Sequence, residues 1–177
     1  MASDNSTRAA AASIASRVGL VFGVLVFASS LLEGSSIAAA QERVAGDDEA
    51  EEVMEMRSKT MKSLGRSMRT LRNFARGQGE AEEAAMAASL IERESANIPA
   101  LFPIGTGLDE FPDSEAKEVI WERWDAFTAS SQQLTEKAAA MMAAIESADK
   151  SRINASFGDL GKNGCGGCHS RFREERD

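Results

Sequence analysis

The sequence predicts an all-α protein: an antiparallel four-helix bundle with one long crossover loop, preceded by a secretory signal peptide. The chain is rich in alanine, glutamate, methionine and arginine and contains no tyrosine, which favours helix over strand. Apolar residues recur at steps of three and four in four separate segments. All three prolines fall in one short stretch between the second and third of these segments.

The N-terminal segment has the order of charges and apolar residues that is typical of a signal peptide. Arg8 and Arg17 precede an apolar run from Val18 to Leu32, and small residues follow up to Ala40. The run is shorter than the about 20 residues that a membrane span needs, which favours a signal peptide. An uncleaved membrane anchor is the alternative. We predict cleavage after Ala40, which removes residues 1–40 and leaves residues 41–177 as one domain in the bacterial periplasm, without stable membrane insertion.

The first two helices are predicted to form a hairpin. The first runs from about Val44 to Arg76, Gly77 and Gly79 then allow a tight reversal, and an alanine-rich helix follows from about Glu80 to Asn97. One stripe of the first helix is expected to face a core. Its members are Val53, Arg57, Met61, Leu64, Met68, Leu71 and Ala75.

The crossover loop is the proline-rich stretch, and two further helices follow it. We expect Asp113 or Ser114 to cap the third helix, whose heptad-like pattern extends to Ile145. A break at residues 147–150 precedes the fourth helix. Its inward residues are expected to be Ile153, Phe157 and Leu160.

The formal net charge of −8 bears on the kind of partner this protein binds. Nucleic-acid binding demands a basic face, so nucleic acid is not expected as a partner. An acidic surface is compatible with a basic redox partner, which the sequence does not identify.

Both cysteines and the only histidine lie in one run, Cys165-Gly166-Gly167-Cys168-His169, which is the attachment signature of c-type haem. Positions i, i+3 and i+4 share one helix face, so two thiols and an imidazole can address one flat porphyrin. A structural zinc site needs four such ligands, and a thioredoxin-like dithiol should accompany a βαβ pattern. We therefore predict one covalently attached haem c, with a thiol oxidoreductase as the alternative.

Arg57 interrupts the apolar stripe of the first helix, and Met61 is a candidate iron ligand on the same stripe. Arg57 needs a partner if buried, which a haem propionate would supply; the alternative is that its guanidinium reaches solvent at the edge of the core. Met61, one turn later, would then face the haem. A thioether is a known iron ligand, although methionine is more often a core filler.

Three glycines and one arginine near the attachment run extend the prediction. Gly164, Gly166 and Gly167 suggest room for a porphyrin to lie against the backbone. Arg173, one turn beyond His169, is expected to place positive charge beside the proximal imidazole, or simply to lie favourably in the last turn of a helix.

With a single histidine, bis-histidine ligation is impossible once His169 holds the iron. The sixth position must be methionine, lysine, water, a diatomic gas or empty. No second histidine can serve as an acid–base group, no Ser/His/Asp set can form, and no phosphate-binding glycine loop follows a strand. We therefore do not expect an enzyme.

Four motifs together point to one family: Arg57-x-x-x-Met61, Phe102-Pro103-Ile104-Gly105-Thr106-Gly107, Ile120-Trp121-x-x-Trp124-x-x-Phe127 and Cys165-Gly166-Gly167-Cys168-His169-x-x-Phe172-Arg173. Through them, residues 45–175 resemble the cytochrome c prime (cytochrome c') family, whose members carry haem at the C-terminal end of a four-helix bundle. The resemblance implies thioethers at Cys165 and Cys168, a proximal ligand at His169, a propionate near Arg57, a distal residue at Met61 and a basic proximal residue at Arg173.

The resemblance leaves the sixth iron position open between two functions. Some members of the family are five-coordinate and bind nitric oxide or carbon monoxide, whereas others ligate iron with a methionine of the first helix and carry electrons. We favour the methionine-ligated electron carrier because the Met61 sulfur can reach the iron. Many members are homodimers through the first two helices, and the alanine-rich second helix is compatible with that.

Overall fold

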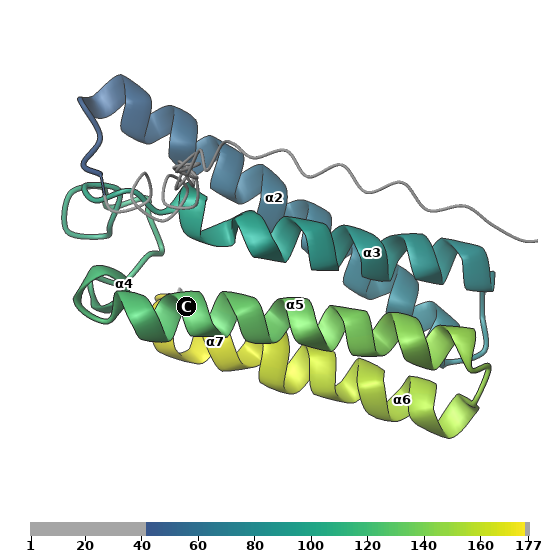
Figure 1. Ribbon diagram of the computed structural model, residues 1–177. Helices are drawn as coiled ribbons and strands as arrows, with labels where there is room; N and C mark the ends of the chain where they lie inside the picture. Colours follow the sequence, from purple (N-terminus) through teal and green to yellow (C-terminus); the bar gives the residue numbers. More distant parts are fainter. Residues whose placement is uncertain (1–41, 176–177) are drawn as a thin grey trace, which may run out of the picture. The chain divides into compact units, whose positions relative to one another are not determined.

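The computed structural model describes residues 42–175, and the predicted signal peptide with its cleavage site lies outside them. The long helices are α2 (Asp47–Ala75), α3 (Ala81–Asn97) and α5 (Trp124–Glu146). The last long helix is composite: α6 (Lys150–Asp159), a π-helical turn over Leu160–Cys165 and α7 (Gly166–Phe172). Two short helices, the 3₁₀ turn Ile98–Leu101 and α4 (Val119–Glu122), flank the crossover loop. The predicted four-helix bundle is confirmed (Figure 1). Among the described residues, no helix is long and apolar enough to span a membrane.

The α2–α3 hairpin forms where the sequence predicts it. Three acidic residues occupy the first turn of α2, where they complement the positive end of the helix dipole. Gly77 and Gly79 both adopt positive φ angles, 81° and 87°, which a residue with a side chain rarely does. The Gly77 amide donates to the Phe74 carbonyl oxygen over 2.8 Å and closes the turn.

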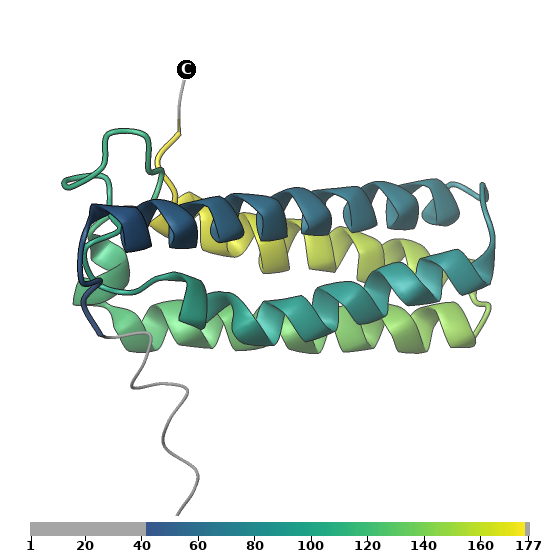
Figure 2. The same ribbon diagram turned by 90° about the horizontal axis from the view of Figure 1, so that it is seen from above.

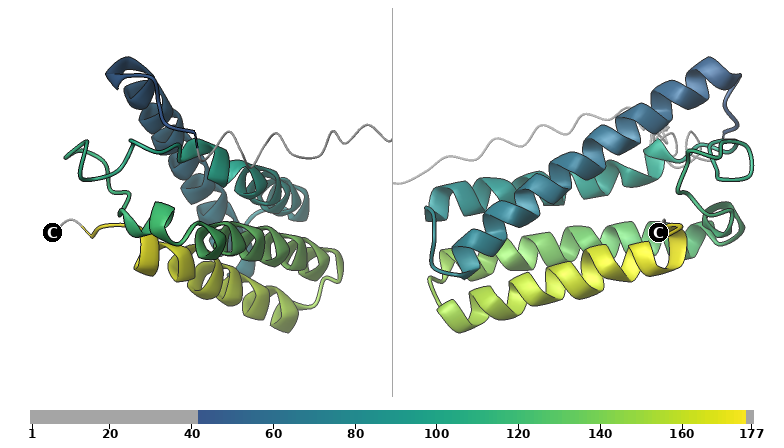
Figure 3. Two further views of the ribbon diagram at one scale, coloured as in Figure 1. Left: turned by 60° about the vertical axis from the view of Figure 1, so that its left-hand side comes forward. Right: turned by 180° about the vertical axis from the view of Figure 1, so that it is seen from behind.

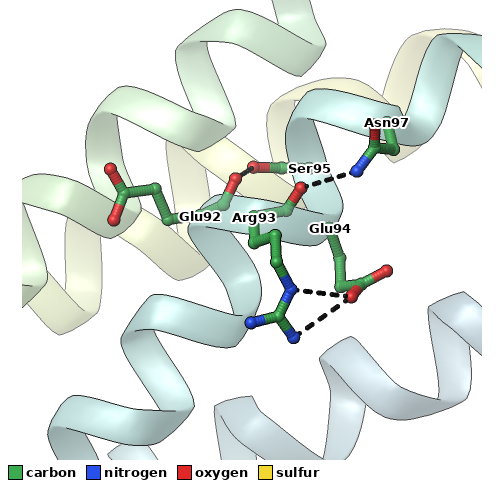
Figure 4. A network of polar contacts seen from close by, with 5 residues as sticks. All are labelled: Glu92, Arg93, Glu94, Ser95 and Asn97. Carbon is green, nitrogen blue, oxygen red and sulfur yellow. Dashed lines mark hydrogen bonds and ion pairs between the residues drawn. The ribbon is translucent and has the colours of Figure 1, made fainter.

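Two side chains bind carbonyl oxygens near the end of α3 (Figure 4). The Ser95 hydroxyl donates to the Glu92 carbonyl oxygen over 2.9 Å, and the Asn97 amide donates to the Arg93 carbonyl oxygen over 3.1 Å. Arg93 also pairs with Glu94 on the exposed side, at 3.3 Å. At its end the Ile98 amide donates to the Ser95 carbonyl oxygen, and the chain passes directly into the 3₁₀ turn.

The third long helix starts later than predicted. Neither Asp113 nor Ser114 caps it: helical structure begins at Val119, breaks at Arg123 and continues as α5. The Ser114 hydroxyl is used within the loop, where it donates to the Thr106 carbonyl oxygen over 2.9 Å. In addition, Ala116 forms a backbone bridge with Arg173 at the far end of the chain. That bridge requires extended backbone, so the helix cannot begin before it.

The α5–α6 connection falls at the predicted break. Ala148 takes a positive φ of 53°, and Asp149 caps α6 by accepting hydrogen bonds from the amides of Ser151 and Arg152 at 2.8 and 3.1 Å. A side-chain cap of this kind contributes about 1 kcal/mol to helix stability.

The helices pack around one core, and Figure 2 shows the long helices side by side. The α5 helix packs on α3 and on all three parts of the last helix, and α2 packs on α3 and α6. Phe127 lies at the centre of an aromatic group, with ring centroids 4.8 Å from Phe102, 5.3 Å from Phe172 and 5.5 Å from Trp124. Toward the crossover-loop end, α2 diverges from α7 (Figures 1 and 3).

Candidate haem site

The two cysteines and the histidine lie at the junction of the π-helical turn and α7. Cys165 ends the turn, and Cys168 and His169 lie in α7. Both cysteines are partly buried and packed against the hydrophobic core, whereas His169 is exposed. The sequence-predicted attachment residues therefore share one short helical segment with side chains that are only partly covered by protein.

The π-helical turn decides which way this segment faces. Leu160, Gly164 and Phe172 are buried and Cys168 is partly buried, so the inward residues recur at steps of four. In a regular α-helix, the 12 residues from Leu160 to Phe172 would rotate the chain to about 120° beyond three full turns. One extra residue in a π-helical turn reduces this to about 20°. The turn therefore keeps the attachment segment on the core-facing side of the helix.

Gly164 has a packing role that differs from the predicted one. A Cβ atom on Gly164 would lie 3.0 Å from Leu134 Cδ1 and 3.5 Å from Lys137 Cδ, both on α5. The absence of a side chain thus lets the π-helical turn approach α5 closely. The expectation that this glycine makes room for a porphyrin is wrong, because the space is taken by α5.

Replacing Gly164 with alanine is expected to destabilise the fold by about 1–3 kcal/mol, since the added methyl group overpacks a buried contact. Urea unfolding of the haem-loaded protein measures this. Gly158→Ala is the matched control: nothing lies within 4 Å of a Cβ there. It should be neutral or stabilising by up to about 1 kcal/mol, as expected for alanine in a helix. Equal effects of the two substitutions would contradict the close approach to α5.

An ion pair fixes the same turn from the α6 side. The Lys137 ammonium on α5 lies 2.6 Å from the Asp159 carboxylate, and the Asn163 amide donates to that carboxylate over 2.6 Å. The hydrogen bond from Lys137 is the main reason that the pKa of Asp159 is below its usual range. The last residue of α6 is thereby tied to both α5 and the π-helical turn.

The thiols are not those of a reactive dithiol. Burial raises the pKa of Cys165, and it raises the pKa of Cys168 to about 11. Redox-active Cys-x-x-Cys pairs have lowered pKa values, because the thiolate is the nucleophile. Within residues 42–175, no three histidine, cysteine or acidic side chains form a group suited to a metal ion. Both observations disfavour the dithiol and zinc alternatives.

Arg173 lies beside the histidine but outside the helix. The α7 helix ends at Phe172, so Arg173 follows the last turn and does not lie in it. Its amide donates to the His169 carbonyl oxygen over 3.0 Å, and its Nε donates to the Glu115 carboxylate over 2.6 Å. Although His169 is exposed, desolvation of its ring lowers its pKa, Arg173 lowers it further, and Glu115 acts in the opposite direction.

Arg57 reaches into the crossover loop, and the alternative that it reaches solvent is wrong. Its guanidinium donates to the carbonyl oxygens of Leu101 and Thr106 and to the hydroxyls of Thr106 and Ser114, over 2.6–3.4 Å. It also lies 4.0 Å from the ring centroid of Phe102. Burial lowers its pKa to about 10. All of these partners in the described part of the chain are uncharged, so Arg57 is a desolvated cation without a carboxylate.

Met61 lies on α2, one turn after Arg57. It is partly buried and packs against the core, as Met68 does further along the helix. The packing of α2 on the last long helix is made mainly with α6, which precedes the attachment segment. The structure therefore places Arg57 and Met61 on one helix and Cys165, Cys168 and His169 on another.

Several residues of this region could not be found from sequence patterns. Thr106 is fully buried beneath Arg57, and Arg171 donates to the Gly167 carbonyl oxygen and to the Ser130 hydroxyl of α5 over 2.9 and 2.8 Å. Glu115 directly precedes Ala116, whose backbone bridge with Arg173 joins the crossover loop to the end of α7. Only Thr106 lies in a motif that the sequence singles out, and its contacts depend on residues far away in the chain.

A family model described as Cytochrome C' matches residues 52–173. The chain belongs to the cytochrome c' family. Its α2 to α7 segment is therefore the family's four-helix bundle, as the motifs at both ends of the chain predict.

Similar proteins agree with this assignment. Cytochrome c' of Pararhodospirillum photometricum is 33% identical over 125 residues, which cover 70% of this chain and 98% of that protein. The solved structure of cytochrome c' from Rhodobacter Spheriodes is 29% identical with a TM-score of 0.65, covering 74% of this chain and 100% of that one. A nitric oxide complex of a mutant cytochrome c prime from Alcaligenes xylosoxidans has a TM-score of 0.61, covering 71% of this chain and 97% of that one; at 22% identity it shows the likeness of fold.

As a cytochrome c', the protein carries covalently attached haem c, and its residues fit that group. Two cysteines lie three residues apart next to the single imidazole, and the Met61 thioether of α2 is partly buried against the same core. Arg57 is a partly buried cation that lacks an anionic partner among residues 42–175. These are the donors and the countercharge that a haem with two propionates requires.

Proposed function

We propose that this cytochrome c' is a periplasmic electron carrier in which Cys165 and Cys168 bind the haem and His169 and Met61 hold the iron. The haem supplies one-electron chemistry, and the protein sets its potential through axial ligation, burial and nearby charge. The observation that carries the proposal is the donor set. There is one imidazole in the sequence, and it lies in the same short helical segment as the only two thiols.

Each residue of the chain has a distinct part in this proposal. The thiols fix the porphyrin edge to α7, and the π-helical turn sets the direction in which that helix presents them. His169 is the proximal ligand. The Met61 thioether, as the sixth ligand, would favour the ferrous form and raise the reduction potential.

Arg57 would pair with a propionate while it holds the crossover loop. Its guanidinium has five N–H donors in a rigid fork, so a loop carbonyl and a carboxylate can be bound together. A desolvated arginine that is bound only by neutral oxygens gains most from a nearby anion. Arg57 would therefore supply the countercharge for a propionate of the bound haem.

The compartment and the absence of catalysis belong to the same proposal. The predicted signal peptide supports the periplasm, and the acidic net charge of −8 supports a basic redox partner. The only histidine is assigned to the iron, which leaves no imidazole for acid–base catalysis. We therefore propose an electron carrier and not an enzyme.

Optical spectroscopy of the haem-loaded protein tests this function. The full chain, expressed with its own leader, should appear in the periplasmic fraction with one covalent haem in a pyridine haemochrome assay. Its ferric and ferrous spectra should be low-spin and unchanged by carbon monoxide. A high-spin spectrum that shifts with carbon monoxide would instead establish the alternative function, the binding of nitric oxide or carbon monoxide at an open iron. Absence of covalent haem would favour the alternative prediction, a thiol oxidoreductase.

A further inference from the structure

The end of the crossover loop is strapped to the segment that follows α7. Ala116 and Arg173 form an antiparallel backbone bridge. The Lys117 amide donates to the Phe172 carbonyl oxygen over 3.1 Å, and the Glu174 amide donates to the Glu115 carbonyl oxygen over 2.8 Å. A loop that starts beside Arg57 on α2 therefore ends beside the histidine-bearing helix.

Two ion pairs lie on this strap, and only one of them includes a residue that is hydrogen-bonded to His169. Arg173 Nε lies 2.6 Å from Glu115 Oε2, and Lys117 Nζ lies 3.3 Å from Glu174 Oε2. The Arg173 amide donates to the His169 carbonyl oxygen over 3.0 Å, so Glu115 holds the side chain of a residue that is bound to the histidine backbone. The amides of Lys117 and Glu174 donate instead to the carbonyl oxygens of Phe172 and Glu115.

We propose that Glu115 is a positioning residue for the proximal side: its carboxylate holds the Arg173 guanidinium next to the His169 segment and offsets the charge of that guanidinium. The consequence is a lower reduction potential than Arg173 alone would set. The inference rests on the proposed function only in that His169 carries the iron.

The direction of the effect follows from charge. A positive charge near the iron favours the ferrous form, because reduction lowers the positive charge on the metal, and net charge is one of the properties that set such potentials. Removing the Glu115 carboxylate leaves the charge of Arg173 uncompensated, while the Arg173 amide stays bound to the His169 carbonyl oxygen. The two side chains are 37% and 49% exposed, so solvent and salt screen them. The effect should therefore be larger at low ionic strength.

The strap holds the backbone of Glu115 independently of its carboxylate. The Glu115 carbonyl oxygen is held by the Glu174 amide, so the backbone of Glu115 keeps its place when only the carboxylate is changed. Glu115→Gln is nearly the same size and preserves this hydrogen bond. It therefore removes charge without removing the strap.

Spectroelectrochemical titration of the haem-loaded protein tests the inference. Glu115→Gln should raise the reduction potential, more at low than at high salt, and Arg173→Gln should lower it. The double variant should return close to the wild-type value. Glu174→Gln, in the same strap, is the matched control: it should change thermal stability about as much as Glu115→Gln and leave the potential unchanged. A shift that is equal in Glu115→Gln and Glu174→Gln, or a fall in Glu115→Gln, would overturn the proposal.

A second measurement reads the position of Arg173 without using the potential. Proton exchange at Arg173 Nε, followed by nuclear magnetic resonance, should be faster in Glu115→Gln than in wild type and unchanged in Glu174→Gln. Exchange that is unaffected by Glu115→Gln would show that the carboxylate does not hold the guanidinium. If the wild-type spectrum proves high-spin while the potential still moves as expected, the Met61 ligation of the proposed function fails and this inference stands. If the spectrum is low-spin and the potential does not move, only this inference fails.

Discussion

Replacing Met61 with alanine is expected to convert a low-spin, carbon monoxide-insensitive spectrum into a high-spin spectrum that shifts when carbon monoxide is added. Alanine has no sulfur, so the iron would lose its sixth ligand while His169 and both thioethers remain. The reduction potential should fall at the same time, since a thioether ligand favours the ferrous form. Optical spectra of the ferric and ferrous variant, with and without the gas, measure both the spin state and the open site.

Met68→Ala is the control for this substitution. Met68 is also a partly buried methionine of α2 that packs against the core, and its Cε would lie 3.6 Å from a Cβ on Gly161. Both variants should lose stability, by up to the roughly 2–5 kcal/mol reported for fully buried methionines. Only the Met61 variant should change the spectrum. An unchanged spectrum in Met61→Ala would show that this methionine fills space and does not ligate the iron.

Replacing Arg57 with alanine is expected to lower the free energy of unfolding by about 2–4 kcal/mol, the cost of leaving two or three partly buried acceptors without a donor. The Leu101 carbonyl oxygen and the Thr106 hydroxyl would lose the guanidinium that now binds them. The crossover loop should loosen first, which hydrogen exchange of residues 101–116 would show. Urea unfolding of the haem-loaded protein measures the total loss.

Two further variants separate the geometry of Arg57 from its charge. Arg57→Lys keeps the charge, but an ammonium cannot bind several loop oxygens in one plane, so it should recover less than half of the lost stability. Arg69→Ala, at an exposed position of the same helix, should stay within about 0.5 kcal/mol of wild type. A fully stable Arg57→Ala protein would mean that the loop is held by its own backbone contacts.

The parts of the fold that depend on local chemistry could be predicted from the sequence. Gly77 and Gly79 mark the first reversal because they supply positive φ angles, and the three prolines mark the crossover because they cannot continue a helix. The attachment run was also recognisable, since its chemistry lies within five consecutive residues. In each case the deciding interactions are made by neighbours in the chain.

The predictions that were wrong or left open concern residues whose partners are distant in sequence. Ser114 has the local pattern of a helix cap, but its hydroxyl binds the loop and the following backbone pairs with Arg173. The partners of Arg57 come from a loop more than forty residues away, so periodicity could place it on a stripe without deciding between solvent and loop. The position of Gly164 beside the attachment run predicts room for a porphyrin, yet its close neighbour is Leu134 on another helix.

The π-helical turn has a consequence for how the sequence of this protein can vary. Between Leu160 and Cys165, the number of residues fixes the orientation of the thiols and the imidazole. Gaining one residue would rotate Cys165, Cys168 and His169 by about 100° relative to the face of α6 that holds Ile153. Losing one residue would let the π-helical turn become regular α-helix and leave these three residues on the same face. A single-residue insertion should therefore abolish haem attachment, whereas a single-residue deletion within the turn should preserve it.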